Sequence, residues 1–148
     1  MKNILLLLLP LLLAACVARK PEDSVLKRAA EFYRQSIAAE KALQPKLDQL
    51  VQYRNSINVQ GRALRPDEIA FVEEVDRVEA DLMGWQENFV GVPGHGPDGQ
   101  PLKPGEAGEQ IDMTPEDALA LQEGLFKNIQ TLAQRVETAL DHYRSLTR

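Results

Sequence analysis

The fold is decided by residues 114–146, which read TPEDALALQEGLFKNIQTLAQRVETALDHYRSL. Thr114 offers a hydroxyl that can cap a helix, and Pro115 suits the first helical turn. The two acids that follow favour the positive end of a helix dipole. Residues spaced alternately by four and three then share one helix face; they are Leu125, Ile129, Leu132, Val136, Ala139, Tyr143 and Leu146. The segment predicts a long amphipathic helix.

Two earlier segments carry the same periodicity and predict two more helices. Residues 66–90 begin with a proline and two acids, and Gly91 and Pro93 after them provide a stop. The face kept by their spacing consists of Phe71, Val75, Val78, Leu82, Trp85 and Phe89. In residues 22–56 the corresponding face consists of Val25, Ala29, Phe32, Ser36, Ala39, Leu43, Leu47 and Leu50.

Pro45 interrupts the first of these helices. A proline in a helix interior removes a backbone donor and clashes with the preceding turn. The helix is therefore expected either to kink at Pro45 or to restart there, and in the second case the domain has four helical segments.

Residues 91–113 separate the last two helices and contain six glycines and four prolines. Helix connections in bundles usually take about 2–8 residues, so this loop is unusually long. No segment alternates with a period of two for long enough to predict a sheet. The sequence therefore predicts an all-α fold, an elongated antiparallel three-helix bundle with a long Gly/Pro-rich loop.

The expected helix lengths do not match, which suggests why the loop exists. At about 1.5 Å per residue, the helix over 66–90 is about one quarter shorter than the other two. The loop must cover the missing distance, which leaves a weakly covered strip. Either the loop packs on this strip through Val92, Leu102 and Ile111, or a partner does. The candidate partner surface, with the sole tryptophan included as an anchor, consists of Phe32, Tyr33, Trp85, Leu121, Leu125 and Phe126.

The first sixteen residues predict a processing signal. Lys2 gives a basic start, and residues 4–13 form an apolar run that is too short for a bilayer of about 30 Å. The run ends in Leu13-Ala14-Ala15-Cys16, which resembles the lipobox of bacterial lipoproteins.

This resemblance implies a signal peptide over 1–15, recognised by its peptidase through Leu13, Ala14, Ala15 and Cys16 and cut before Cys16. The covalent diacylglycerol and N-acyl chain on Cys16 would be the only cofactors. Residues 16–21 would be a short tether and 22–148 a single helical domain. Because Val17 rather than Asp follows the cysteine, the resemblance implies the periplasmic face of the outer membrane, or the outer face of the inner membrane under a different sorting rule.

The charge balance argues against nucleic acid as a partner. The chain carries 17 basic and 22 acidic residues, a net charge of −5. Removing Lys2 with the signal makes the domain about one unit more acidic, whereas nucleic-acid binding requires clustered basic residues. The expected partners are the membrane, through the lipid, and an envelope protein or a second copy of the chain.

The familiar catalytic and metal-binding motifs do not predict a site. Residues 94–99, GHGPDG, match the glycine spacing of a dinucleotide-binding loop, but they follow no predicted strand and open no helix. The only histidines, His95 and His142, form neither H-E-x-x-H nor C-x-x-C-H. We expect no catalytic residues and no metal site. The alternative is a periplasmic bundle that binds a small ligand, a metal or haem.

Two short motifs add a second resemblance. Residues 44–47, QPKL, and Met83-Gly84-Trp85 are similar to motifs in a family of small helical bacterial lipoproteins. That resemblance implies the helical architecture and carries no activity with it.

Overall fold

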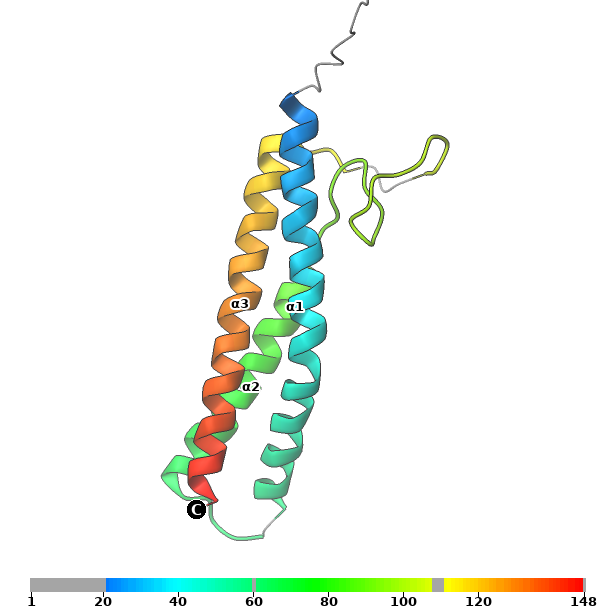
Figure 1. Ribbon diagram of the computed structural model, residues 1–148. Coiled ribbons are helices and arrows are strands. Elements are labelled where there is room, and N and C mark those ends of the chain that lie inside the picture. Colours follow the sequence, from blue (N-terminus) through cyan, green and yellow to red (C-terminus); the bar gives the residue numbers. More distant parts are fainter. Residues whose placement is uncertain (1–20, 60, 108–110, 148) are drawn as a thin grey trace, which may run out of the picture.

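The computed structural model describes residues 21–59, 61–107 and 111–147, and in this part of the chain the structure has three helices and no strand. The helices are α1 (Pro21–Asn58), α2 (Pro66–Glu87) and α3 (Pro115–Leu146). The two long helices, α1 and α3, run side by side in the same direction, and the shorter α2 runs antiparallel behind them (Figure 1). The described part is therefore the predicted elongated three-helix bundle.

Helix starts follow the chemistry of their first residues. The Thr114 hydroxyl accepts a hydrogen bond from the Asp117 amide at 3.2 Å, which caps α3. At the start of α2, the Arg65 amide donates to the Glu68 carboxylate at 2.9 Å. A proline occupies the first turn of both helices, as the sequence predicted.

Pro45 does not divide the first helix, so the four-segment alternative is wrong. α1 continues from Pro21 to Asn58 with Pro45 inside it. Pro45 itself is exposed, whereas Leu43 and Leu47 on either side of it are buried. Their burial stabilises each by about 1.5–3 kcal/mol, which together offsets the cost of about 3 kcal/mol for an interior proline.

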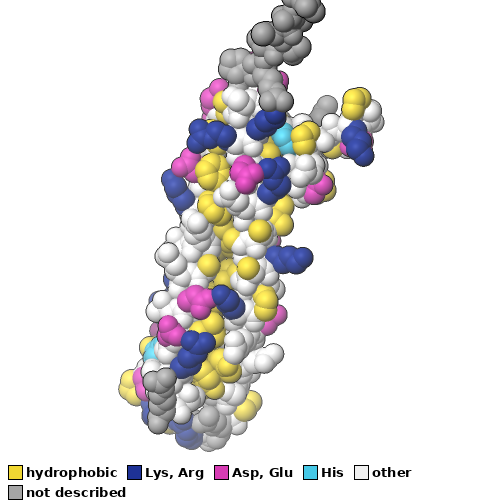
Figure 2. Space-filling model, in the orientation of Figure 1, with side chains coloured by type: hydrophobic (Ala, Val, Ile, Leu, Met, Phe, Trp, Pro, Cys, Tyr) yellow, Lys and Arg dark blue, Asp and Glu magenta, His cyan; other side chains and the backbone are white. Residues whose placement is uncertain are grey.

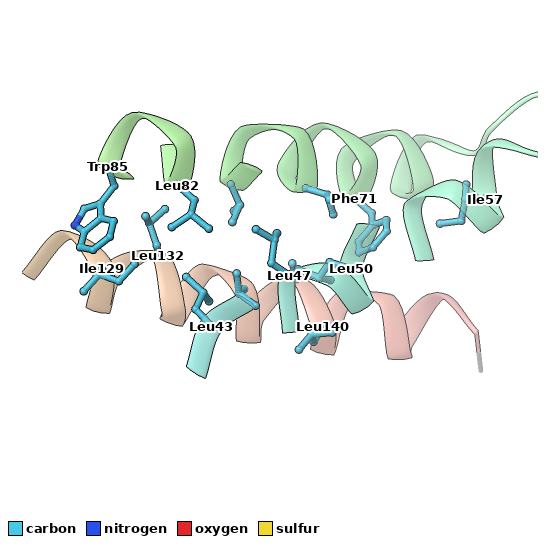
Figure 3. Close-up of a cluster of buried hydrophobic side chains, with 14 of the residues drawn as sticks. Leu43, Leu47, Leu50, Ile57, Phe71, Leu82, Trp85, Ile129, Leu132 and Leu140 are labelled. Atoms are coloured by element: carbon cyan, nitrogen blue, oxygen red, sulfur yellow. The ribbon is translucent and has the colours of Figure 1, made fainter. Parts of the chain in front are cut away.

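The main core fills the space among the three helices. Figure 3 shows side chains from α1, α2 and α3 converging along the bundle axis. Its members include Leu43, Leu47, Leu50 and Ile57 from α1, Phe71, Leu82 and Trp85 from α2, and Ile129, Leu132 and Leu140 from α3. The helices are held by the apolar faces that their periodicity predicted.

Ion pairs between helices flank this core. Arg135 of α3 contacts Glu74 at 2.8 Å and Asp81 at 2.5 Å, both on α2. Arg54 of α1 contacts Asp76 of α2 at 2.5 Å. Partly exposed pairs of this kind contribute on the order of 1 kcal/mol each, so they support the register of helices that the core already holds together.

α2 ends at Glu87, three residues before the predicted end at Val90. The Asn88 side chain donates to the Gly84 carbonyl oxygen at 2.7 Å and closes the last turn. Phe89 then leaves the helix and stacks on Tyr33 of α1, with ring centroids 4.8 Å apart. Phe89, whose spacing predicted a longer helix, is therefore packed against α1 from outside the helix.

The long loop packs on α1 next to the start of α3 and, of the residues predicted to form the weakly covered strip, it covers Tyr33. Val92 is 1% exposed and packs in a second cluster with Ala29, Ala30 and Ala118. Arg34 donates to the Gly99 carbonyl oxygen at 3.1 Å. The loop covers the part of α1 that α2 is too short to reach (Figure 1).

Gly99 is buried against α1 with a φ of +71°. A Cβ there would lie 2.7 Å from Arg34 Cγ and 3.2 Å from Tyr33 Cδ1. Glycine is therefore required at position 99 for two reasons: the backbone is left-handed, and it approaches the helix too closely for a side chain.

Candidate interaction surface

The structure divides the six predicted partner-surface residues among three places. Tyr33 lies beneath the loop, and Trp85, Leu121 and Leu125 line a groove between α2 and α3. Phe32 and Phe126 contact each other across α1 and α3. Helical spacing alone did not show that these residues lie in three different places.

Tyr33 is taken up by contacts within the chain. Its side chain is 6% exposed and stacks on Phe89, and its hydroxyl donates to the Pro97 carbonyl oxygen at 3.3 Å. The stack continues from Phe89 to Trp85, whose ring centroids are 4.5 Å apart. Tyr33 therefore joins the loop to the bundle and offers no free surface for a partner.

The groove between α2 and α3 has a volume of about 630 Å³. Its apolar lining comes from Ala80, Gly84, Trp85, Leu121, Leu125 and Leu132, and its polar lining from Asp81, Asn88, Asn128 and Thr131. Trp85 is 5% exposed, and its indole Nε1 donates to the Leu125 carbonyl oxygen at 2.9 Å. Trp85 is thus a fixed part of the groove wall. An apolar surface with polar edges can hold an apolar side chain or a helix of a partner.

The third place is the face of α1 and α3 that points away from α2. Apolar side chains gather along the boundary between the two long helices in Figure 2, which views the molecule from the side opposite α2. The rings of Phe32 and Phe126 are 5.7 Å apart, and Lys46 of α1 forms an ion pair with Glu137 of α3. Phe32 and Phe126 are both half-buried.

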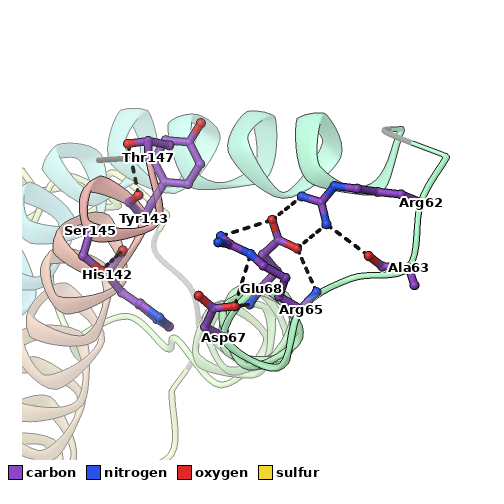
Figure 4. A network of polar contacts seen from close by, with 9 residues as sticks. All are labelled: Arg62, Ala63, Arg65, Asp67, Glu68, His142, Tyr143, Ser145 and Thr147. Atoms are coloured by element: carbon purple, nitrogen blue, oxygen red, sulfur yellow. Dashed lines mark hydrogen bonds and ion pairs between the residues drawn. The ribbon is translucent and has the colours of Figure 1, made fainter.

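The end of the bundle opposite the start of α1 carries a charged network (Figure 4). Arg62 donates to both carboxylate oxygens of Glu68, at 2.9 and 2.6 Å, and the Arg65 amide donates to the same group. These bonds lower the pKa of Glu68 from 4.5 to about 2, with the Arg62 side chain the largest cause. Because every oxygen of this buried carboxylate is engaged, the network fixes the turn between α1 and α2 and is not arranged for proton transfer.

The glycine motif at 94–99 folds as a tight turn. The Gly96 amide donates to the Gln100 carbonyl oxygen at 2.8 Å, and His95 pairs with Pro101 in an isolated bridge. His95 Nδ1 lies 3.0 Å from the Pro93 carbonyl oxygen. Among the described residues, no three His, Cys, Asp or Glu side chains lie close enough to hold a metal ion. None of the three described helices is long and apolar enough to cross a bilayer.

The predicted lipidation and cleavage residues, Leu13, Ala14, Ala15 and Cys16, lie outside the described residues. Sequence reasoning also missed several groove residues, Ala80, Gly84, Asn88, Asn128 and Thr131. A signal was present for Gly84, because a glycine weakens the interior of a helix and its place in the predicted helix therefore called for an explanation.

No family model, curated protein or solved structure matches this chain.

Proposed function

We propose that this chain is a bacterial lipoprotein, anchored through acyl chains on Cys16, which holds a non-enzymatic helical module beside a bilayer to engage an envelope protein or itself. The observation that carries the proposal is the distance between the signal and the fold. α1 begins at Pro21, five residues after the cysteine of the lipobox-like motif. An extended tether of that length reaches only about 17 Å, so the bundle would stay close to the membrane surface.

The energetics of acylation support this anchor. Each buried methylene contributes about 0.8 kcal/mol, and two or more chains give stable binding where one chain does not. Cys16 is the only cysteine, so acylation would leave no free thiol in an oxidising compartment. With Val17 after the cysteine, we place the protein on the periplasmic face of the outer membrane, or on the inner membrane if the sorting rule differs.

The described surface supports binding rather than catalysis. The groove beside Trp85 and the face around Phe32 and Phe126 offer apolar area with charged edges. The carboxylate with the strongest pKa shift, Glu68, is fully occupied by Arg62 and Arg65. A rigid, elongated bundle with apolar area along its length suits contacts with other helices.

The test is acyl labelling and fractionation of cells that produce the wild-type chain or Cys16→Ser. We expect the wild type to incorporate labelled fatty acid and to sediment with membranes, and we expect Cys16→Ser to take up no label and to accumulate as precursor or soluble protein. Val17→Ala, next to the cysteine, serves as the control and should label like the wild type. Equal labelling of Cys16→Ser and wild type would overturn the proposal.

A second function, binding of a small apolar ligand, is supported by the groove of about 630 Å³ beside Trp85. The metal and haem versions of that alternative lack such support among the described residues, where no metal-binding cluster occurs. Trp85 fluorescence titrated with an apolar probe such as an anilinonaphthalene sulfonate distinguishes this function. A saturable change that is lost in Gly84→Trp, which fills the groove, would favour it.

A further inference from the structure

One face of the bundle combines apolar rows with separated charges, and we call it the open face. On α1 it consists of Phe32, Ala39, Lys46 and Tyr53, which are seven residues apart, and on α3 of Leu119, Phe126 and Ala133, also seven apart, with Glu137 one turn further. Except for Lys46 and Glu137, all of these residues are half-buried. Figure 2 shows the apolar stripe between the two helices, with charged side chains on both sides of it.

α2 does not cover this face. The residues that pair with α2 lie on other sides of the two long helices: Arg54 and Glu40 on α1 and Arg135 on α3. The loop packs on α1 at Ala30, Tyr33 and Arg34, which point to a different side of the helix from the open face. The inner sides of both rows pack against the core, and their outer sides stay partly exposed between the two long helices.

We propose that the open face binds a second copy of this chain in parallel orientation, with α1 of each copy against α3 of the other. A twofold axis parallel to the helices keeps each residue of the partner at its own level. The Phe32 and Phe126 rows of the two copies then meet in the middle of a four-helix layer, with each α2 on the outside.

The charges of the open face favour this orientation. Arg28 lies about five helical turns before Lys46 on the same side of α1, and Glu123 lies about four turns before Glu137 on α3, where it also pairs with Lys127 at 3.0 Å. Lys46 and Glu137 form an ion pair within the chain, which shows that they lie at the same level. In a parallel dimer Lys46 therefore also faces the partner's Glu137, and Arg28 lies about one turn from the level of the partner's Glu123. Basic side chains thus meet acidic ones at both positions.

The available area also agrees with a dimer. From Arg28 to Tyr53 the face runs for about 38 Å along α1, and two helices side by side are roughly 20 Å wide. The resulting area is about 750 Å² per copy, close to the roughly 800 Å² that each partner contributes to an interface of standard size.

The orientation rests on the proposed function. If Cys16 is acylated, both tethers leave from the end where α1 begins, and two copies in one bilayer stand in parallel. Confinement to the same membrane raises the effective concentration of each copy for the other. Association through the face itself does not require the lipid.

The test measures association in the full-length chain carrying Cys16→Ser, kept in mild detergent, by sedimentation velocity over a range of concentrations. We expect a monomer–dimer equilibrium. Arg28→Glu with Lys46→Glu should weaken the dimer on the order of a hundredfold, because acidic residues then face acidic residues. Adding Glu123→Lys and Glu137→Lys to that variant should restore the affinity of the dimer. Lys41→Glu with Lys103→Glu changes the net charge equally off the open face and should leave the dimer unchanged.

Orientation is read from a label at Val59→Cys, the only thiol in the Cys16→Ser chain and a site that is 81% exposed. A parallel dimer places the two labels roughly 20–40 Å apart, whereas an antiparallel dimer over the same face separates them by about 60 Å. A monomer at every concentration, a dimer insensitive to the Arg28 and Lys46 reversals, failure of the fourfold reversal to restore it, or the long label distance would each overturn the proposal. Because none of these measurements needs acylation, they decide it independently of the anchor.

Discussion

The indole Nε1 of Trp85 donates a 2.9 Å hydrogen bond to the Leu125 carbonyl oxygen, and this bond joins the end of α2 to the first half of α3. A helix-interior carbonyl oxygen normally accepts only from the amide four residues later, so Trp85 uses its second lone pair. The bond places the indole against α3 and turns its edge into one wall of the groove. The single tryptophan therefore shapes a surface while remaining 5% exposed.

Trp85→Phe should lower the free energy of unfolding by about 1–3 kcal/mol, because it removes a buried donor and part of a packed ring. Urea unfolding followed by circular dichroism measures the change. Met83→Leu on the same helix is the control, because Met83 is 61% exposed and its replacement should stay within about 0.5 kcal/mol. Equal stability of Trp85→Phe and wild type would mean that this bond contributes nothing to folding.

Gly99→Ala should loosen the loop from α1. Alanine at a φ of +71° is strained by about 1–2 kcal/mol, and its Cβ would also approach Arg34 Cγ to 2.7 Å. Gly105→Ala is a matched control, because Gly105 has a φ of +89° but nothing within 4 Å of a Cβ. Amide hydrogen exchange of residues 92–102 should increase far more in Gly99→Ala. If both variants exchange alike, the contact with α1 does not hold the loop.

The three helices could be predicted because their apolar faces and end signals agree with the tertiary packing. The end of α2 could not, because Phe89 lies four residues after Trp85 and fits the same helical face. Only the stack of Phe89 on Tyr33, a contact between residues far apart in the chain, shows why the helix stops at Glu87. The sequence around Pro45 also could not decide whether the helix continues there. A helix tolerates this proline only because Leu43 and Leu47 are buried against other helices, and that burial is not visible in the local sequence.

The sequence indicated which apolar residues to consider for an interaction surface, but it did not indicate how they are arranged in space. Phe32 and Tyr33 are neighbours in sequence and point about 100° apart on a helix, so one meets α3 and the other meets the loop. The periodicity of α1 does not say on which side the loop returns. That choice depends on Gly99 and on where α3 begins, and both are set by packing across the bundle.

Gly84→Ala and Gly124→Ala should each stabilise the protein by roughly 0.5–1 kcal/mol. Both glycines lie inside helices, and nothing lies within 4 Å of the Cβ that alanine would add. Alanine therefore gains helix propensity without a clash. Thermal unfolding should show a higher midpoint for both. Gly61→Ala, at a φ of +65° in the turn after α1, should instead lower it. A loss of stability in Gly84→Ala would show that the groove is narrower in solution.

Glu68 makes the stability of the bundle depend on acid pH. Its pKa is about 2 in the folded chain against an ordinary 4.5, so the unfolded chain binds more protons between these values. The contribution of Glu68 to stability is fully present above about pH 4.5 and is lost as the pH falls towards about 2. Wild-type unfolding free energy should therefore decline through that window, as measured by urea unfolding at several pH values.

Glu68→Gln isolates this effect, because the amide keeps an acceptor for the Arg65 backbone but cannot hold the charge that binds Arg62. The variant should be less stable than wild type at neutral pH, and the difference should shrink as the pH approaches 2. Glu73→Gln is the control, since the Glu73 side chain is 62% exposed and its nearest ion-pair distance to Arg77 is 3.4 Å. A constant difference between Glu68→Gln and wild type at every pH would show that the Arg62 bonds do not depend on the ionisation of Glu68.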